Sequence, residues 1–560
     1  MEHCLTSKKS DCKNCYKCIR SCPTKSISFS SNQANIIHDE CVFCGNCFVE
    51  CPQSTKVIRD DTKKVLDLLK GSSDVYVSIA PSLFSYYHTS YEALERAILK
   101  LGFKGVYETA LGAMEVKKEY EKILKNSEQD IVISSCCHSV NLLIEKHYPK
   151  AIPFLAKVLS PMITNGKEIK ALHPNAKVVF IGPCISKKHE ADTYQGVIDV
   201  VLTFDELDKL FLHDDIKVES EPITALNKSK TRLFPIGGGI INTLDNKRDY
   251  DYDYIVVDGM QSCIEALKEI ETGNIHKCFI EMSACRGSCI NGPIIARQKK
   301  NILLGYKHIK DAAGPEDFEI ENEFTRKELV RNFKSFGLTI ATPSENDINT
   351  VLVKKMKKPT LKDQLNCGSC GYNTCREKAI GIIQGKASVE MCLPYLMAKT
   401  ESFSDQIIFN TPNGILVLNE SLQIQLANNA MARLVGVSNN KFLVGNNITS
   451  ILDPTDYAIA LAHNTKVTTK RKYLSEYDKY VEETIIYDEK YHIIIIILRD
   501  VSVEEKTLDQ KRTQTSSSIE ITNKVIEKQM IVAQEIASLL GETTAETKVA
   551  LTALKNLLEK

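Results

Sequence analysis

Two cysteines lie four residues apart in the stretch Glu281-Met-Ser-Ala-Cys285-Arg-Gly-Ser-Cys289-Ile-Asn-Gly292. Two earlier stretches carry related groups: Ser134-Ser-Cys-Cys137 ends in a cysteine pair, and Gly182-Pro-Cys-Ile-Ser-Lys-Lys-His-Glu190 joins a cysteine to lysines and a glutamate. Thiolates are soft ligands that suit iron–sulfur clusters. The three loops supply enough thiolates for one [4Fe–4S] cluster, from Cys137, Cys184, Cys285 and Cys289. The extra cysteine, lysine and glutamate beside them indicate that an anionic group is bound there too.

These three loops, in this order and at these separations, resemble the signature loops of [FeFe]-hydrogenases over about residues 70–310. The resemblance implies an H-cluster, in which the four cysteines hold a cubane and Cys289 bridges to a two-iron subsite with CO, cyanide and dithiolate ligands. It also implies that Lys187 donates to a cyanide in a charge-assisted contact, that Glu190 orients Lys187, and that Cys136 passes protons to the bridging amine. The expected catalytic residues are therefore Cys136, Lys187 and Glu190.

The same resemblance implies residues that bind the cofactor. The loop Ala80-Pro81-Ser82 matches one that cradles a second cyanide, and Phe234 with Gly237-Gly238-Gly239 matches a further wall of the pocket. Ser283 stands where the family usually has a methionine. The expected cofactor-binding residues are Ala80, Pro81, Ser82, Phe234 and Ser283.

Several positions depart from the family pattern. His138 replaces a proline, Met162 replaces a glutamine, and the outer proton-relay positions fall at Tyr120, Ile123 and Ala156. A proton relay needs groups within hydrogen-bond reach of one another, so turnover is expected to be slow unless Glu119 or Glu121 substitutes. His138 is a candidate for titration at neutral pH, although a histidine that is hydrogen-bonded to its neighbours is the favoured interpretation.

Residues 1–62 carry a doubled pattern of cysteines followed by proline. The run C-x2-C-x2-C-x3-C-P wraps a cubane with three cysteines while the fourth crosses to the other cluster. The segment resembles bacterial two-cluster ferredoxins; two zinc knuckles are the alternative. One expected [4Fe–4S] cluster is held by Cys12, Cys15, Cys18 and Cys51, and the other by Cys41, Cys44, Cys47 and Cys22.

Residues 356–400 carry a further set of four cysteines. It resembles the iron–sulfur modules of redox and corrinoid-activating proteins, so a [4Fe–4S] cluster is expected, with structural zinc as the alternative. Its ligands are Cys367, Cys370, Cys375 and Cys392. The remaining cysteines, Cys4, Cys263 and Cys278, have no partner at ligand spacing and are expected to be buried apolar residues or an inert terminal thiol.

The chain is expected to be a multidomain α/β protein. Residues 70–355 alternate apolar runs with helical stretches, which favours an α/β hydrogenase domain; Val75–Ile79, Ile131–Ser134, Val178–Ile181 and Ile255–Val257 are predicted buried strands. Residues 401–505 resemble a PAS α+β domain. Residues 506–560 contain one glycine and no proline and are predicted to form a helical coiled coil or an amphipathic hairpin.

Composition excludes some classes of partner. Lys+Arg and Asp+Glu both number 71, so no charge excess favours nucleic acid or a membrane surface. The most apolar run, Ile493–Leu498, is too short to span a bilayer and is predicted to be one buried strand. The first residues lack the features of a signal peptide, and in a cytoplasmic compartment the 20 cysteines are not expected to form structural disulfides. A cytoplasmic location is expected.

These features favour a sensory [FeFe]-hydrogenase that interconverts H2 and protons slowly. The alternatives are a turnover hydrogenase coupled to ferredoxin and a hydrogenase-like iron–sulfur protein without the two-iron subsite. The expected partners are H2, protons, a redox partner such as ferredoxin, and a signalling kinase or phosphatase. A homodimer through the PAS domain and the tail is expected. His492 is the last histidine, so the tail offers no histidine phosphoacceptor.

Overall fold

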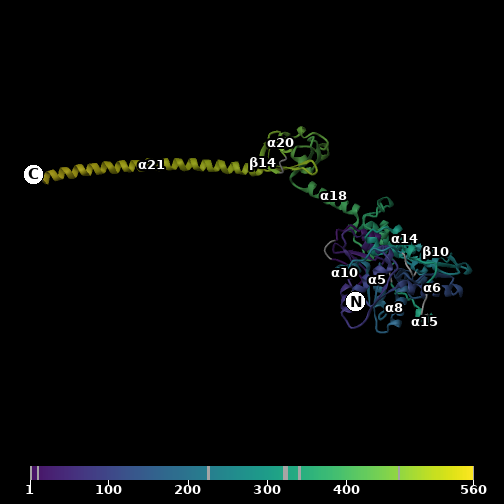
Figure 1. Ribbon diagram of the computed structural model, residues 1–560. Coiled ribbons are helices and arrows are strands. Elements are labelled where there is room, and N and C mark those ends of the chain that lie inside the picture. The colour runs from purple at the N-terminus through teal and green to yellow at the C-terminus, as the bar shows by residue number, and fades with distance from the viewer. Residues whose placement is uncertain are drawn as a thin grey trace. The chain divides into compact units, whose positions relative to one another are not determined.

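The computed structural model describes residues 3–8, 12–223, 228–318, 326–338, 342–463 and 467–558 (Figure 1). The chain divides into two compact units, Met1–Leu396 and Met397–Lys560. Within the described part of the chain, no helix has both the length and the hydropathy needed to cross a bilayer.

The N-terminal segment folds as two similar halves. Each half has one short helix, α1 (Lys17–Ser21) or α2 (Asn46–Glu50). The residue before each helix adopts the left-handed conformation: Tyr16 has φ 55° and Gly45 has φ 79°. A Cβ at position 45 would lie 2.5 Å from Pro293, so glycine is required for the second half to pack against the next domain. The strands pair as β1 (Leu5–Ser7) with β4 (Lys56–Ile58) and β2 (Ile27–Ser30) with β3 (Gln33–Ile36).

The central domain contains two parallel sheets. One has the order β6-β5-β8-β9 and the other the order β10-β11-β7. Their strands are β5 (Val75–Ile79), β6 (Gly105–Glu108), β7 (Ile131–Ile133), β8 (Lys177–Gly182), β9 (Val200–Thr203), β10 (Asp253–Asp258) and β11 (Cys278–Ser283). The main connecting helices are α5 (Tyr91–Lys100), α6 (Thr109–Lys125), α7 (His138–His147), α8 (Pro161–Leu172), α9 (Ser186–Thr193) and α12 (Met260–Thr272). Parallel strands joined through helices confirm the predicted α/β domain.

One strand that was predicted to be buried is largely exposed. The strand over Ile255–Val257 exists as part of β10, but β10 lies at the edge of its sheet, and Ile255 and Val256 are 38% and 47% exposed. An apolar run of this length does not tell an edge strand from a central one. The other three predicted strands are buried, as the sequence indicated.

A short segment connects the central domain to the four-cysteine module. After α15 (Arg326–Leu329), residues 330–338, here called the strap, run across the surface of α7 and lead toward α16 (Glu345–Thr350). Helix α16 and the following turn pack against α17 (Cys375–Ile383) around Ile348, Leu352 and Ala379. Helix α18 (Leu393–Asn410) then reaches the boundary between the two units.

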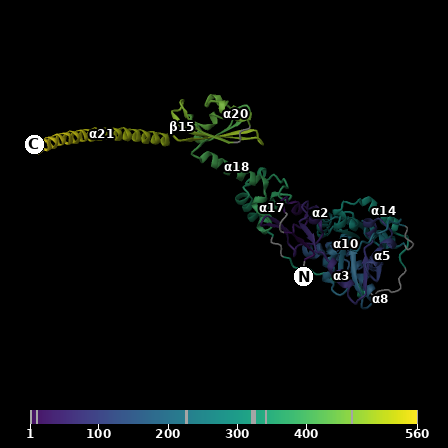
Figure 2. The same cartoon turned by 60° about the vertical axis from the view of Figure 1, so that its left-hand side comes forward.

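The second unit is a five-stranded antiparallel sheet with helices around it (Figure 2). The strand order is β13-β12-β16-β15-β14. The bounds are β12 (Gly414–Asn419), β13 (Ile424–Ala427), α19 (Asn429–Leu434), α20 (Thr455–His463), β14 (Val467–Leu474), β15 (Lys479–Asp488) and β16 (Ile493–Asp500). Strand β14 was not predicted. The run Ile493–Leu498 forms one strand, as predicted; alternate residues are buried and the others are half-buried.

The tail is one continuous helix. Helix α21 (Ser502–Leu558) runs for 57 residues without a turn (Figure 1), so the hairpin alternative is wrong. Its large apolar side chains, such as Val525, Ile536 and Leu554, are 52%, 52% and 57% exposed.

Candidate active site and cluster sites

The functional loops of the central domain all follow the carboxyl ends of parallel strands. Ala80 follows β5, Ser134 follows β7, Pro183 follows β8 and Ala284 follows β11. In open parallel sheets this edge is where ligands bind. The chain therefore brings segments as far apart in sequence as Ala80 and Ala284 to one place.

Four cysteines from these loops gather there. Burial raises the pKa of Cys137, and the neighbouring Cys184 adds to the effect. Burial and then Cys184, Cys289 and Cys137 raise the pKa of Cys285. Four mutually close, buried thiols are costly as separate groups, and metal binding relieves this cost because thiolates are the ligands. The arrangement fits the predicted cubane.

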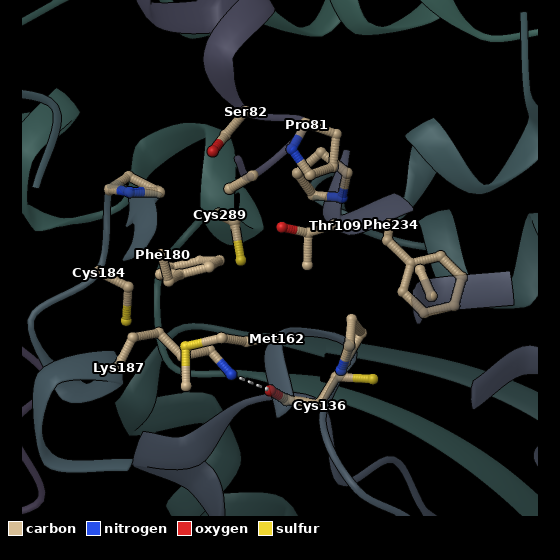
Figure 3. Close-up of a pocket in the computed structure, with 15 residues that line it drawn as sticks. Pro81, Ser82, Thr109, Cys136, Met162, Phe180, Cys184, Lys187, Phe234 and Cys289 are labelled. Carbon is tan, nitrogen blue, oxygen red and sulfur yellow. Dashed lines mark hydrogen bonds between the residues drawn. The ribbon is translucent and has the colours of Figure 1, made fainter. Parts of the chain in front are cut away.

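A cavity of about 100 Å³ opens beside these cysteines. As predicted, Ala80, Pro81, Ser82 and Phe234 line it, together with Cys136, Cys184, Lys187 and Cys289 (Figure 3). Among the described residues, the fully buried Ser82 Oγ has no hydrogen-bond partner. An orphaned hydroxyl, an ammonium and a cysteine around an apolar cavity fit a group with polar, anionic ligands such as the two-iron subsite.

Some pocket residues were not predicted, and one predicted residue lies elsewhere. Thr109, Ala113, Phe180 and Pro235 also line the cavity. Thr109 directly follows β6, and residues at the carboxyl ends of parallel strands are those expected to line a ligand site, so Thr109 could have been predicted. Ser283 is not among the described residues that line the cavity; its hydroxyl donates to the Cys285 carbonyl at 3.4 Å.

Lys187 and Glu190 form a buried ion pair. Lys187 Nζ donates to Glu190 Oε2 at 2.6 Å and to the Cys136 carbonyl at 3.3 Å. Burial lowers the pKa of Lys187, but Glu190 outweighs this and the pKa is raised, so the ammonium is charged at neutral pH. The other Glu190 oxygen accepts from Arg331 Nη1 at 3.1 Å. Arg331 was not predicted, because nothing in its local sequence resembles a motif.

Cys136 contacts a tyrosine at the position of a predicted relay residue. The Tyr120 hydroxyl lies 3.2 Å from Cys136 Sγ and accepts the Ser135 backbone N–H at 2.9 Å. Ile123 and Ala156, the other two relay positions, are buried in an apolar cluster with Tyr120. The two predicted substitutes have other partners: Glu119 pairs with Lys122 at 2.7 Å, and Glu121 accepts the Asp245 N–H at 2.7 Å.

Glu281 is a further titratable group near Cys136 that the sequence did not indicate. It lies in β11, is 3% exposed, and accepts the Ile241 backbone N–H at 3.0 Å. Burial raises its pKa to about 7, and backbone N–H groups of the Gly238–Ile241 turn oppose this. Its charge in turn raises the pKa of Cys136. A carboxyl poised near neutrality is suited to exchange protons.

The Glu281 carboxyl is expected to be protonated below about pH 7 and ionised above it. Because its folded pKa is raised, its contribution to stability is fully present below its unfolded value and is lost as the pH rises through about 7. Infrared difference spectra between about pH 6 and about pH 8 should show a carboxylic-acid band that Glu281→Gln removes. A band that persists in the variant would contradict this assignment.

His138 is hydrogen-bonded to a second histidine, as favoured. His138 Nε2 lies 2.9 Å from His189 Nδ1, and His189 stacks on Phe43 at 4.8 Å between ring centroids. Burial lowers the pKa of His138 well below its usual value and that of His189 to about 4. Both rings are therefore neutral at physiological pH.

The structure groups the ferredoxin-type cysteines as the crossing pattern predicts. Cys12, Cys15, Cys18 and Cys51 line one small cavity. Cys22 lies close enough to raise the pKa values of Cys41, Cys44 and Cys47 after burial has done so. Cys44 in turn contributes to the raised pKa of Cys285. This second set therefore lies next to the cysteines of the central domain.

The four-cysteine module packs on the ferredoxin-type segment. Cys367, Cys370, Cys375 and Cys392 line one small cavity. Arg20 Nη2 donates to the Gly368 carbonyl at 3.1 Å, and Lys25 Nζ donates to the Gly371 carbonyl at 3.1 Å. Cys4, Cys263 and Cys278, predicted as non-ligands, are 2%, 0% and 1% exposed.

Three protein-family models each match a part of the first unit. Residues 73–293 match the iron only hydrogenase large subunit, C-terminal domain; residues 4–53 match a 4Fe-4S dicluster domain; and residues 363–394 match an Fe-S cluster family. The chain therefore carries a ferredoxin-like iron–sulfur domain, a hydrogenase domain and a small iron–sulfur domain.

Individual proteins are similar to parts of the chain. Iron hydrogenase 1 of Clostridium pasteurianum is 27% identical over 35% of this chain and 44% of its own length. The periplasmic [Fe] hydrogenase large subunit of Nitratidesulfovibrio vulgaris is 23% identical over 35% of this chain and 60% of its own. The chain thus spans about half the length of these relatives. A variant of the [FeFe]-hydrogenase HydA1 from Chlamydomonas reinhardtii is similar in structure, with 17% identity, coverage of 50% of this chain and 100% of that one, and a TM-score of 0.37. A PAS domain of an HTR-like protein from Haloarcula marismortui has 18% identity, coverage of 19% and 96%, and a TM-score of 0.17.

Proposed function

We propose that this chain, which joins an iron-only hydrogenase large-subunit domain to two smaller iron–sulfur domains, is a sensory [FeFe]-hydrogenase with low turnover. It interconverts H2 and protons and relays the redox state of its clusters to the second unit. The observation that carries the proposal is the convergence of Lys187, Cys136 and Ser82 on one cavity beside four cysteines, with Lys187 held by Glu190.

The H-cluster, when bound, supplies the irons at which H2 is split and a store for electrons. Cys137, Cys184, Cys285 and Cys289 would hold its cubane, and Lys187 and Ser82 would donate to its anionic ligands. The apolar walls from Phe180, Met162 and Phe234 keep bulk water from the cavity. Of these groups, Cys184, Cys289, Lys187 and Ser82 line the cavity.

Cys136 is suited to hold and pass a proton. Burial raises the pKa of its thiol to about 12, so the sulfur carries a proton at neutral pH and returns to that state after each transfer. Burial raises the pKa of Tyr120 far above its usual value, so Tyr120 passes a proton only by exchanging the one it holds. A relay that meets a buried phenol and then the apolar Ile123 and Ala156 is slow. This supports low turnover.

The order of the cysteine sets supports an electron route through the first unit. The set of Cys22 and Cys41 lies beside the cubane cysteines, and the four-cysteine module contacts Arg20 and Lys25 of the same ferredoxin-type segment. Cysteine sets held in adjoining segments of one compact unit are suited to electron transfer. The Cys367–Cys392 cluster would thus exchange electrons with the ferredoxin-type clusters and report the redox state toward α18.

The second unit supports an output by contact with other proteins. Its five-stranded sheet has the order 2-1-5-4-3 of its own strands, which suits the proposed PAS domain. The apolar side chains along α21 are exposed in the single chain, and long helices with such a stripe associate in coiled coils. We therefore assign α21 to a cytoplasmic homodimer that binds a kinase or phosphatase, while a ferredoxin exchanges electrons with the first unit.

The test uses hydrogen exchange on the full-length, matured protein under H2 and under mild oxidant. Protection in residues 401–560 is expected to differ between the two states, because only a difference between states transmits a signal. A chain that lacks residues 401–560 should retain hydrogen chemistry. Identical protection in both states would contradict the sensory function and leave a turnover hydrogenase.

A further inference from the structure

Arg331 is a buried cation that belongs to the strap but reaches the active site. Its side chain is 4% exposed, and its Nη1 donates to Glu190 Oε1 at 3.1 Å. Glu190 is fully buried and uses its other oxygen for Lys187 at 2.6 Å. One carboxylate is therefore shared by two cations, Lys187 from α9 and Arg331 from the strap.

The strap is fixed so that Arg331 cannot easily leave Glu190. The backbone N–H of Arg331 donates to the Lys157 carbonyl at 3.2 Å, and the Arg331 guanidinium lies 4.5 Å from the Phe333 ring centroid. Further along, the Lys334 N–H donates to Glu145 Oε1 at 3.1 Å, and the Phe336 N–H donates to the Glu145 carbonyl at 3.1 Å. Glu145 lies on α7, the helix that begins after Cys137. The strap thus bridges α7 and α9.

Two cations share Glu190, and a second carboxyl group lies near one of them. Lys187 and Arg331 both contact Glu190, and Arg331 also acts on Glu145 of α7, where it opposes the rise in pKa that burial causes. Burying a charge is costly unless an opposite charge lies nearby. Lys187 lines the cavity, so its ammonium is placed to meet an anionic ligand there.

We propose that Arg331 is a positioning residue for the active site. By sharing Glu190 it fixes the carboxylate that orients Lys187, and it frees the Lys187 ammonium to donate into the cavity instead of neutralising Glu190 alone. The inference rests on the proposed function, because Lys187 is taken to donate to a cyanide of the H-cluster.

The test compares Arg331→Met and Arg331→Gln, which remove the charge, with Arg331→Lys, which keeps it. In matured protein, the cyanide infrared bands should shift in both neutral variants and return toward wild type in Arg331→Lys. The rate of H2 oxidation should fall roughly tenfold to a hundredfold in the neutral variants, as for loss of a charge-assisted contact. Arg59→Met is the matched control, because Arg59 pairs with Asp192 on the same helix at 2.8 Å without touching Glu190.

A second readout does not require the two-iron subsite. In protein that carries only its cubanes, hydrogen exchange of α9 should increase in the two neutral variants and not in Arg331→Lys. Unchanged cyanide bands and unchanged α9 exchange in both neutral variants would overturn the inference while leaving the proposed function intact. Absence of cyanide bands from the wild type would instead defeat the proposed function, and α9 exchange would still decide whether Arg331 positions Glu190.

Discussion

Replacing Cys136 with alanine is expected to lower the rate of H2 oxidation by about 10²–10⁴-fold, the range typical of a positioned proton carrier. The thiol lines the cavity, carries its own proton at neutral pH, and lies 3.2 Å from the Tyr120 hydroxyl. Alanine leaves the cavity without a group that bridges to Tyr120. The rate is measured with a dye acceptor on matured protein, normalised to iron content.

Cys263→Ala is the matched control for this experiment. Cys263 is also a buried cysteine of the central domain, but its thiol donates to the Ser283 carbonyl at 3.4 Å. The control should retain the wild-type rate. An unchanged rate in Cys136→Ala would mean that protons reach the cavity by another route, and the Glu281 carboxyl would become the first group to replace.

Replacing Lys187 with methionine is expected to reduce retention of the two-iron subsite about tenfold to a hundredfold, because a charge-assisted hydrogen bond to an anionic ligand is lost. The fold should survive, because Arg331 still compensates the buried Glu190 carboxylate. The measurement is the intensity of the CO and cyanide infrared bands per cubane after maturation.

Lys188→Met separates this effect from general destabilisation. Lys188 is the next residue and is also buried, but it pairs with Asp61 at 2.8 Å and Glu206 at 2.9 Å. This control should unfold at a lower temperature while the folded protein keeps its infrared bands. Equal loss of the bands in both variants would show that Lys187 acts through stability alone.

The grouping of the cysteines could be predicted from sequence because cluster ligation imposes strict spacing, whereas their role as ligands stays a prediction. Cys12–Cys18 with Cys51 and Cys367–Cys392 each gather at one cavity, as their spacing indicated. The pocket loop at Ala80–Ser82 was predicted because its residues lie in a continuous stretch of chain. Local patterns of this kind survive without knowledge of the tertiary fold.

The residues that were missed act through contacts between distant segments. Arg331 lies 141 residues from Glu190, and Glu281 accepts the backbone N–H of Ile241, which lies 40 residues earlier. No periodicity or spacing encodes such pairs. The exposure of β10 was not predicted because the sequence of an apolar strand does not show whether the strand lies at the edge or in the centre of a sheet.

The central claim is that the cavity beside Cys289 holds a two-iron subsite with CO and cyanide ligands. The most direct test is the infrared spectrum of the anaerobically matured protein, recorded beside protein produced without maturation enzymes. The account predicts CO and cyanide bands in the matured sample only. In both samples, the iron content should correspond to four filled cysteine sets. A matured sample with full cubane iron and no such bands would contradict the claim and identify the chain as an iron–sulfur protein without hydrogen chemistry.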